Sequence, residues 1–174
     1  MINKIHICGN YGSGKSSLAK NFSDYLDIPY HSLDDIKYRT KYYDLRPVDE
    51  RITRIEEICN QQRWITEGTW SDYAERAFEK ADLVVLIQLP IIVCDYNILK
   101  RHFSRREGER TTFLETIQLM KEARKYYKTS QPVSLKSHQY LIRKHNKNNI
   151  VIKKRKDINL LFFDLSIMKQ ISSR

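Results

Sequence analysis

The sequence predicts a single α/β domain in which a parallel sheet is covered by helices on both faces. Its 174 residues are enough for one domain with one sizeable core. Short apolar runs alternate with longer stretches of helical character, which is the pattern of successive βαβ units. One apolar run, residues 83–89, is nearly continuous, as expected for a strand that is buried on both faces.

The first part of the chain is expected to hold two strands and one helix. Residues 2–8 have the apolar character of a strand that ends at Gly9, and residues 15–26 are expected to form a helix. Residues 29–33 form a short second strand that leads into an acidic pair. The carboxyl ends of both strands therefore carry residue types that suit a functional site.

One long helix and two strands are expected in the middle of the chain. Pro47 suits the first turn of a helix, and apolar residues recur at a spacing of three to four up to about residue 62. Residues 63–66 form a third strand that stops at Glu67-Gly68, and residues 83–89 form the fourth strand.

The last part of the chain is expected to begin with a basic helix over residues 91–106. Thr112 and Glu115 have the spacing of a capping box for a helix near residues 112–128. Residues 150–152 form a last short strand, and Asp157 is expected to cap a final helix.

Composition excludes several classes of protein. A chain with 30% charged and 11% aromatic residues is not disordered in character. The longest apolar run, residues 83–87, is far shorter than the ~20 residues that cross a bilayer. The three cysteines, Cys8, Cys59 and Cys94, are odd in number and far apart, so neither a disulfide framework nor a zinc site is expected. No leader pattern opens the sequence, and the cytoplasm is the expected compartment.

The excess of basic residues lies entirely in the second half of the chain. The net charge of +10 divides into −2 for residues 1–90 and +12 for residues 91–174. Such a basic half is compatible with nucleic-acid binding, but no zinc-finger or basic-region motif and no interleaved aromatic residues accompany it.

One motif carries the strongest functional prediction. Residues 9–16, Gly-Asn-Tyr-Gly-Ser-Gly-Lys-Ser, fit the pattern G-x-x-x-x-G-K-[ST] between a strand and a helix. Glycines let successive N–H groups converge on a phosphate, and the helix adds its positive N-terminal end. Lys15 is expected to reach the β- and γ-phosphates and Ser16 to bind Mg²⁺. The residues predicted to bind ATP or ADP here are Gly9, Asn10, Tyr11, Gly12, Ser13, Gly14, Lys15, Ser16 and Ser17.

This loop and four further segments resemble the small P-loop kinases related to adenylate and shikimate kinases. Within them the chain is most similar to proteins called DNA topology modulation protein FlaR-like, or adenylate-kinase-like ATPases. The resemblance is carried by residues 5–19, 28–35, 63–70, 81–90 and 100–106, and it covers about residues 1–110.

The resemblance implies one kinase domain over residues 1–174, with a parallel sheet in the order 2-3-1-4-5. It also implies an acceptor-side helical region at residues 34–62, an arginine-rich helical lid at about residues 100–112, and phosphoryl transfer from ATP.

In the resembled kinases, a carboxylate at the end of the second strand faces the acceptor. Asp34 is the first candidate for this role and Asp35 the second; each can orient a hydroxyl, accept its proton or hold Mg²⁺. The alternative role is that of a helix cap. The kinases also place an acid and a glycine after the third strand, here Glu67 and Gly68, near Mg²⁺ and the acceptor.

Further residues are weaker candidates for the site. Trp70 either lines the acceptor pocket or packs structurally, and Arg76 can reach an acceptor phosphate. Arg101 and Arg105 share one helix face, where they either stabilise the transferred phosphoryl group or form a solvated basic face. Arg155 lies in a basic loop that in similar kinases passes the nucleotide base; a solvated loop or a nucleic-acid patch are the alternatives.

Together these features favour a kinase that moves the γ-phosphoryl group of Mg-ATP to a hydroxyl or phosphate of a small molecule. Two alternatives stay open. One is a nucleic-acid kinase or ATP-dependent DNA-binding factor, which the basic half motivates. The other is a nucleotide-binding regulatory protein with little turnover.

Overall fold

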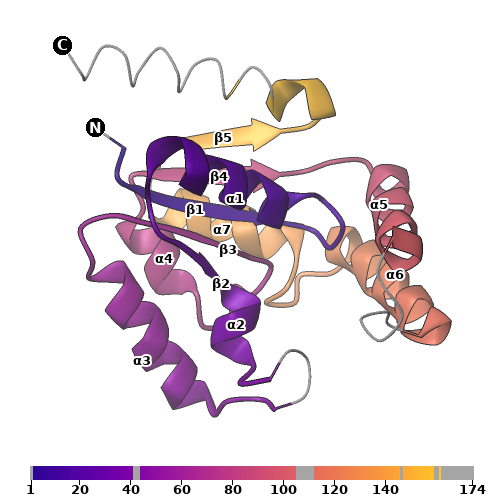
Figure 1. Cartoon of the computed structure of the whole chain (residues 1–174), viewed down its shortest axis with the longest axis horizontal. Helices are drawn as coiled ribbons and strands as arrows, with labels where there is room; N and C mark the ends of the chain where they lie inside the picture. Colours follow the sequence, from indigo (N-terminus) through magenta and orange to yellow (C-terminus); the bar gives the residue numbers. More distant parts are fainter. Residues whose placement is uncertain (1, 41–43, 105–111, 146, 159–160, 162–174) are drawn as a thin grey trace.

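The computed structural model describes residues 2–40, 44–104, 112–145, 147–158 and 161. At its centre is a five-stranded, fully parallel sheet in the order β2-β3-β1-β4-β5 (Figure 1). The strands are β1 (Lys4–Gly9), β2 (Tyr30–Ser32), β3 (Trp64–Gly68), β4 (Leu83–Ile87) and β5 (Asn149–Ile152). The predicted fold class and the strand order that the resemblance implied are both confirmed.

The sheet separates two apolar layers because alternate residues of a strand face opposite sides. In β1, Ile5 and Ile7 pack in the layer that contains α1 (Lys15–Leu26), whereas Cys8 packs in the opposite layer. The opposite layer is covered by α3 (Val48–Cys59), α4 (Glu75–Lys80) and α7 (Leu135–Lys144). All five residues of β4 are buried, as its continuous apolar sequence predicts.

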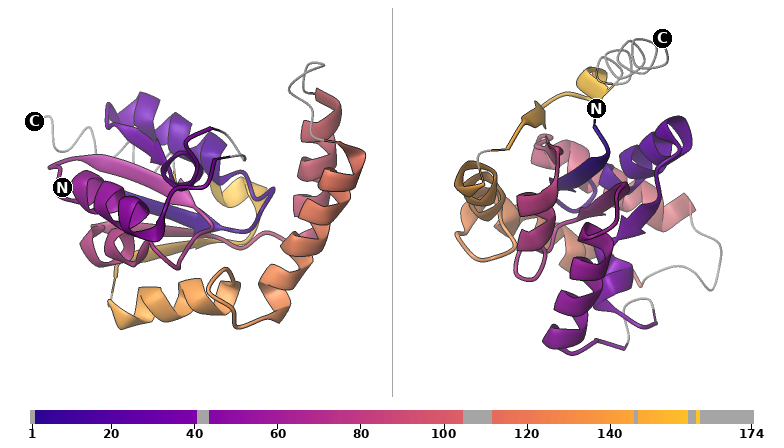
Figure 2. Two further views of the ribbon diagram at one scale, coloured as in Figure 1. Left: turned by 90° about the horizontal axis from the view of Figure 1, so that it is seen from below. Right: turned by 90° about the vertical axis from the view of Figure 1, so that its left-hand side faces the viewer.

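Three helices flank the carboxyl end of the sheet. The short helix α2 (Leu33–Lys37) follows β2 directly. Helices α5 (Ile91–Ser104) and α6 (Phe113–Lys128) pack against each other and stand beside the sheet (Figure 2). The predicted capping box of α6 is present, with the side chains of Thr112 and Glu115 each accepting a hydrogen bond from the other residue's backbone N–H.

Several details differ from the sequence-based expectations. Helices α4 and α7 were not expected. Helix α4 has only six residues, and α7 has ten although Ser134 caps its N-terminus by accepting a hydrogen bond from the N–H of Ser137. Asp157 does not precede the last helical turn, which begins at residue 155. Its carboxylate instead reaches back and accepts hydrogen bonds from the N–H groups of Lys153 and Lys154.

Within the described part of the chain, none of the helices combines the length and the apolar character needed to span a bilayer. The three cysteines are buried and free.

Candidate functional site

The glycine-rich loop connects the end of β1 to the start of α1 at the carboxyl edge of the sheet. Gly12 and Gly14 have φ angles of 69° and 89°, which other residues rarely adopt. A Cβ atom at Gly12 would lie 2.5 Å from the backbone oxygen of Cys94 in α5. Glycine is therefore required at position 12 both for the turn and for the close approach of α5. Turns of this kind direct successive N–H groups toward a single anion.

Side chains from the α5–α6 pair and from the loop itself hold the loop in place. The amide of Asn10 is fully buried and donates to the carbonyl of Ala123 in α6 at 2.8 Å. The amide of Asn97 in α5 donates to the carbonyl of Gly12 at 2.8 Å. The ammonium of Lys15 folds back over the loop and donates to the carbonyl of Asn10 at 3.2 Å. The loop is thus preorganised, and Lys15 lies where it can move onto a bound phosphate.

The loop also contains a buried polar atom without a partner. The hydroxyl of Ser13 is buried, and among the described residues it makes no hydrogen bond. An unsatisfied buried hydroxyl costs free energy that a ligand oxygen can recover. This atom therefore fits a phosphate group in the loop.

Glu67 connects the loop to the neighbouring strands. Its side chain is 3% exposed, and its Oε1 atom accepts hydrogen bonds from three hydroxyls. These donors are Ser16 at 3.1 Å, Tyr30 at 3.2 Å and Ser32 at 3.0 Å. The pKa of Tyr30 is raised, first by burial and then by the charge of Glu67. The predicted metal-ligating pair Ser16 and Glu67 is therefore in direct contact.

This pairing fits a magnesium ion with few protein ligands. No group of three His, Cys, Asp or Glu side chains converges within the described ranges. Mg²⁺ characteristically keeps several waters and binds one or two carboxylates together with phosphate oxygens. Ser16 at the end of the loop and Glu67 in β3 are a hydroxyl and a carboxylate of the kind that such a site would use.

Asp34 lies at the start of α2, on the same edge of the sheet. Its Oδ1 atom accepts a hydrogen bond of 2.7 Å from the indole Nε1 of Trp70. The helix cap is Ser32, whose hydroxyl accepts from the N–H of Asp34, so Asp34 does not act as the cap. Asp35 points to solvent. Gly68 allows this packing, because a Cβ atom there would lie 2.6 Å from the Cβ of Leu33.

Lys37 joins this group; it follows Asp34 by one helical turn but was not among the predicted site residues. Its Nζ atom lies 2.9 Å from the centroid of the Trp70 indole ring. Burial lowers the pKa of Lys37 to about 8, with Arg51 lowering it further and Asp72 and Asp34 opposing the shift. Tyr11 of the loop meets Trp70 edge to face, with ring centroids 6.5 Å apart. We call Tyr11, Asp34, Lys37, Trp70 and Asp72 the Asp34 cluster.

A buried histidine supports the segment that carries Trp70. His138 in α7 contacts the carbonyl of Thr69 through Nε2 at 3.1 Å and the hydroxyl of Tyr126 in α6 through Nδ1 at 2.8 Å. A carbonyl only accepts, so Nε2 carries the proton and Nδ1 accepts from Tyr126. Burial lowers the pKa of His138 to about 4, which keeps the ring neutral. No sequence pattern identified this bridge, because its three residues are far apart in the chain.

A cavity of about 190 Å³ lies beside the loop. Its lining includes Ser13, Gly14 and Ser17 from the loop and α1, together with Asn97 and Arg155. The guanidinium of Arg155 donates to Asn97 at 3.0 Å. The predicted residues Ser17 and Arg155 therefore lie next to the loop.

The other predicted cationic residues are placed differently. Arg101 follows Asn97 by four residues in α5 and so shares the helix face that meets the loop. Arg105 and most of the predicted lid fall outside the described residues. Arg76 in α4 is paired with Glu79 and neighbours Cys59 and Glu56, so it is not brought to the site.

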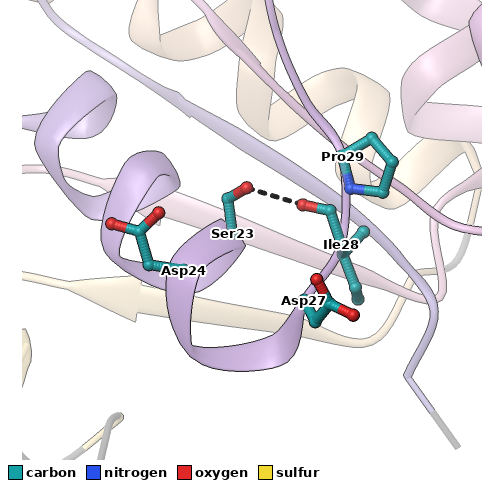
Figure 3. Close-up of a pocket in the computed structure, with 5 residues that line it drawn as sticks. All are labelled: Ser23, Asp24, Asp27, Ile28 and Pro29. Carbon is teal, nitrogen blue, oxygen red and sulfur yellow. Dashed lines mark hydrogen bonds between the residues drawn. The ribbon is translucent and has the colours of Figure 1, made fainter.

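Another hollow in the surface lies at the opposite end of α1 (Figure 3). It is lined by Ser23, Asp24, Asp27, Ile28 and Pro29. Asp24 and Asp27 make this hollow acidic, which disfavours phosphate. It does not belong to the loop site.

The fold has counterparts among solved structures. No family model matches the chain, and no curated protein matches it. A shikimate kinase from Acinetobacter baumannii, solved in complex with shikimate, superposes with a TM-score of 0.61 at 14% identity, over 100% of this chain and 97% of that one. A shikimate kinase from Bacteroides thetaiotaomicron superposes with a TM-score of 0.55 at 13% identity, over 98% of this chain and 99% of that one. The narrower resemblance to topology modulation proteins has no match behind it and stays a prediction. The likeness to the two enzymes shows that this chain has the P-loop kinase fold.

Proposed function

We propose that this protein is an ATP-dependent kinase that transfers the γ-phosphoryl group of Mg-ATP to a hydroxyl or phosphate of a small molecule. One observation carries the proposal. The glycine-rich loop with Lys15 and the carboxylates of Asp34 and Glu67 meet at the carboxyl ends of β1, β2 and β3, where open α/β sheets bind ligands. A polyphosphate site and a base for the acceptor then lie side by side.

The nucleotide is held by the loop and its surroundings. The residues Gly9, Asn10, Tyr11, Gly12, Ser13, Gly14, Ser16 and Ser17 form the cradle. Lys15 leaves the carbonyl of Asn10 and pairs with the β- and γ-phosphates. The base enters the cavity beside Arg155. Arg101 and Arg105 supply further positive charge to the transferred group.

Ser16 and Glu67 hold Mg²⁺, with Asp34 available through a water. Bound Mg²⁺ neutralises charge on the phosphates and orients them for in-line transfer. The carboxylate of Asp34 orients the acceptor hydroxyl and accepts its proton. Trp70 and Gly68 shape the acceptor side, and Asp35 and Arg76 are at most peripheral to it.

Nucleotide binding is tested by calorimetric titration of ADP with and without Mg²⁺. Lys15→Ala should weaken binding by at least about tenfold, because a charge-assisted contact to phosphate is lost. Lys20→Ala is the matched control, since Lys20 is exposed on the same helix. Equal affinities of the two variants would contradict the assignment of the loop.

Transfer is tested by measuring acceptor-dependent ADP formation over a panel of alcohols, nucleosides and nucleotides. Asp34→Asn should lower the turnover of any active acceptor by about 10² or more, because general base catalysis contributes that much. The exposed neighbour provides the control Asp35→Asn. Equal turnover in the parent and Asp34→Asn would remove Asp34 from the chemistry.

A further inference from the structure

The Asp34 cluster contains two groups that take up the space and the hydrogen bonds an acceptor would need. We propose that Trp70 and Lys37 determine acceptor specificity and that an acceptor displaces both. The hydroxyl of the acceptor donates to Asp34 in place of the indole N–H. The acid group of the acceptor forms an ion pair with Lys37, whose ammonium then leaves the indole face. The acceptor class is therefore an alcohol that carries a phosphate or carboxylate group. This inference rests on the proposed kinase function and names its substrate class.

The first part of the argument concerns the bond between Trp70 and Asp34. An indole N–H is only a donor, and it lies 2.7 Å from the carboxylate oxygen. A carboxylate that orients an acceptor must likewise accept a hydrogen bond, in that case from the hydroxyl of the acceptor. The indole therefore occupies the position of an O–H group, and Asp34 cannot present this oxygen to an acceptor until Trp70 moves away.

The second part concerns the ammonium of Lys37. In the described part of the chain Lys37 has no ion pair; its charge rests on the Trp70 ring at 2.9 Å, with the Tyr38 ring 5.5 Å away. Burial outweighs the carboxylates of Asp72 and Asp34 and lowers the pKa of the group. Among the described residues the ammonium thus rests on an aromatic face and not in an ion pair, and an arriving anion would pair with it more strongly than that face does.

These two contacts are mechanically linked through one side chain. Trp70 donates a hydrogen bond to Asp34 through its ring nitrogen, and its ring face makes the cation–π contact with Lys37. A ligand that draws Lys37 off the ring also removes one of the interactions that keep Trp70 in place. An acceptor with both a hydroxyl and an acid group can therefore displace the pair together, whereas a neutral alcohol breaks the bond to Asp34 alone.

Tryptophan emission tests the proposal, because the chain has only two tryptophans and Trp64 is fully buried. With the loop saturated by ADP and Mg²⁺, the protein is titrated with inorganic phosphate and then with glycerol 3-phosphate at constant ionic strength. Both should change the emission saturably. Glycerol 3-phosphate should bind about tenfold tighter, since its hydroxyl adds a bond to a charged group.

Variants assign the signal. Trp70→Phe should abolish the response. Lys37→Met should weaken both probes by about tenfold or more, whereas Lys20→Met should leave both unchanged. Asp34→Asn should remove the advantage of glycerol 3-phosphate over phosphate.

The proposal is overturned if neither probe changes the emission of Trp70, or if Lys37→Met responds like the parent protein. It is equally overturned if glycerol binds as tightly as glycerol 3-phosphate. These results are distinct from failure of the kinase function, which shows as loss of ADP binding or of transfer.

Discussion

The proposed nucleotide side and the proposed acceptor side of the site are built in different ways. The nucleotide side is one continuous stretch, residues 9–17, in which the backbone is expected to do most of the binding. The acceptor side, the Asp34 cluster, joins side chains from the glycine-rich loop, from α2 and from the segment after β3. The first depends on backbone conformation and the second on side-chain packing. Tyr11 belongs to both sides, but substitutions elsewhere should affect the two sides separately.

The largest expected effect concerns two buried histidines, His6 in β1 and His138 in α7. His6 and His138 are buried, and burial lowers their pKa values to about 3 and about 4. Both rings are neutral in the folded protein, whereas the unfolded chain takes up protons near pH 6.5. Their contribution to stability is therefore complete above pH 6.5 and is lost as the pH falls toward 4.

Between pH 7 and pH 4.5 this linkage should lower the free energy of unfolding by about 5 kcal/mol. Urea denaturation at both pH values measures the loss. A His138→Gln variant retains a donor for the Thr69 carbonyl and should lose about half as much on acidification. Equal stability of the parent protein at pH 7 and pH 4.5 would show that the histidines do not act as buried neutral groups.

The next effect separates backbone strain from steric overlap within the nucleotide side. Gly12→Ala combines a positive φ with a Cβ that would lie 2.5 Å from a backbone oxygen. It should lower the free energy of unfolding by about 3 kcal/mol. Gly14→Ala has a positive φ but no atom within 4 Å of the added Cβ, and it should cost about 1–2 kcal/mol. Denaturant midpoints measure the loss of unfolding free energy in both variants. An equal loss would mean that close contact with α5 does not restrict position 12.

A smaller effect should be confined to the acceptor side. Gly68→Ala places a methyl group 2.6–2.8 Å from side-chain atoms of Leu33, which precedes Asp34. The overlap should shift α2 and lower the free energy of unfolding by about 1–3 kcal/mol. Acceptor-dependent turnover should fall while ADP affinity is retained. A parallel fall in ADP affinity would show that the two sides are not separable.

The smallest effect sharpens the description of the Asp34 cluster. Lys37 loses its charge as the pH rises through about 8, so the cation leaves the indole face of Trp70. Tryptophan emission should therefore titrate with a midpoint near pH 8 in the free protein. The Lys37→Met variant should give a flat profile over the same range, and a midpoint that persists in this variant would assign the titration to another group.

The contrast between the two sides also explains what the sequence could and could not predict. The loop was identifiable because its conformation depends on glycines at fixed spacing, a property of neighbouring residues. The boundaries of α1 were predicted without error, and β1 and β4 nearly so, since apolar runs and their ends are local signals. The alternation of strands and helices predicted a parallel sheet, but the order of the strands in it came from the resemblance and not from any local signal.

The residues that sequence reasoning missed are those that meet only through the fold. Tyr30 and Ser32 share an oxygen of Glu67, and Lys37 lies on Trp70, but none of these pairs has a sequence spacing that predicts contact. A signal existed for Lys37 alone, because it follows Asp34 by one helical turn. The +12 charge of residues 91–174 still predicts nucleic-acid binding as an alternative, and salt-dependent DNA titration would test it.

The position of β1 in the middle of the sheet bears on the order of events during synthesis. β1 leaves the ribosome before β3 and β4, yet Ile5 pairs with Ile65 on one side and Leu83 on the other. The carbonyl of Gly12 finds its donor only when Asn97 has been added. Such distant pairings close late, because the intervening chain must first lose conformational entropy. The segment that is made first is therefore among the last to be completed, and nascent chains that end before α5 should lack a formed loop.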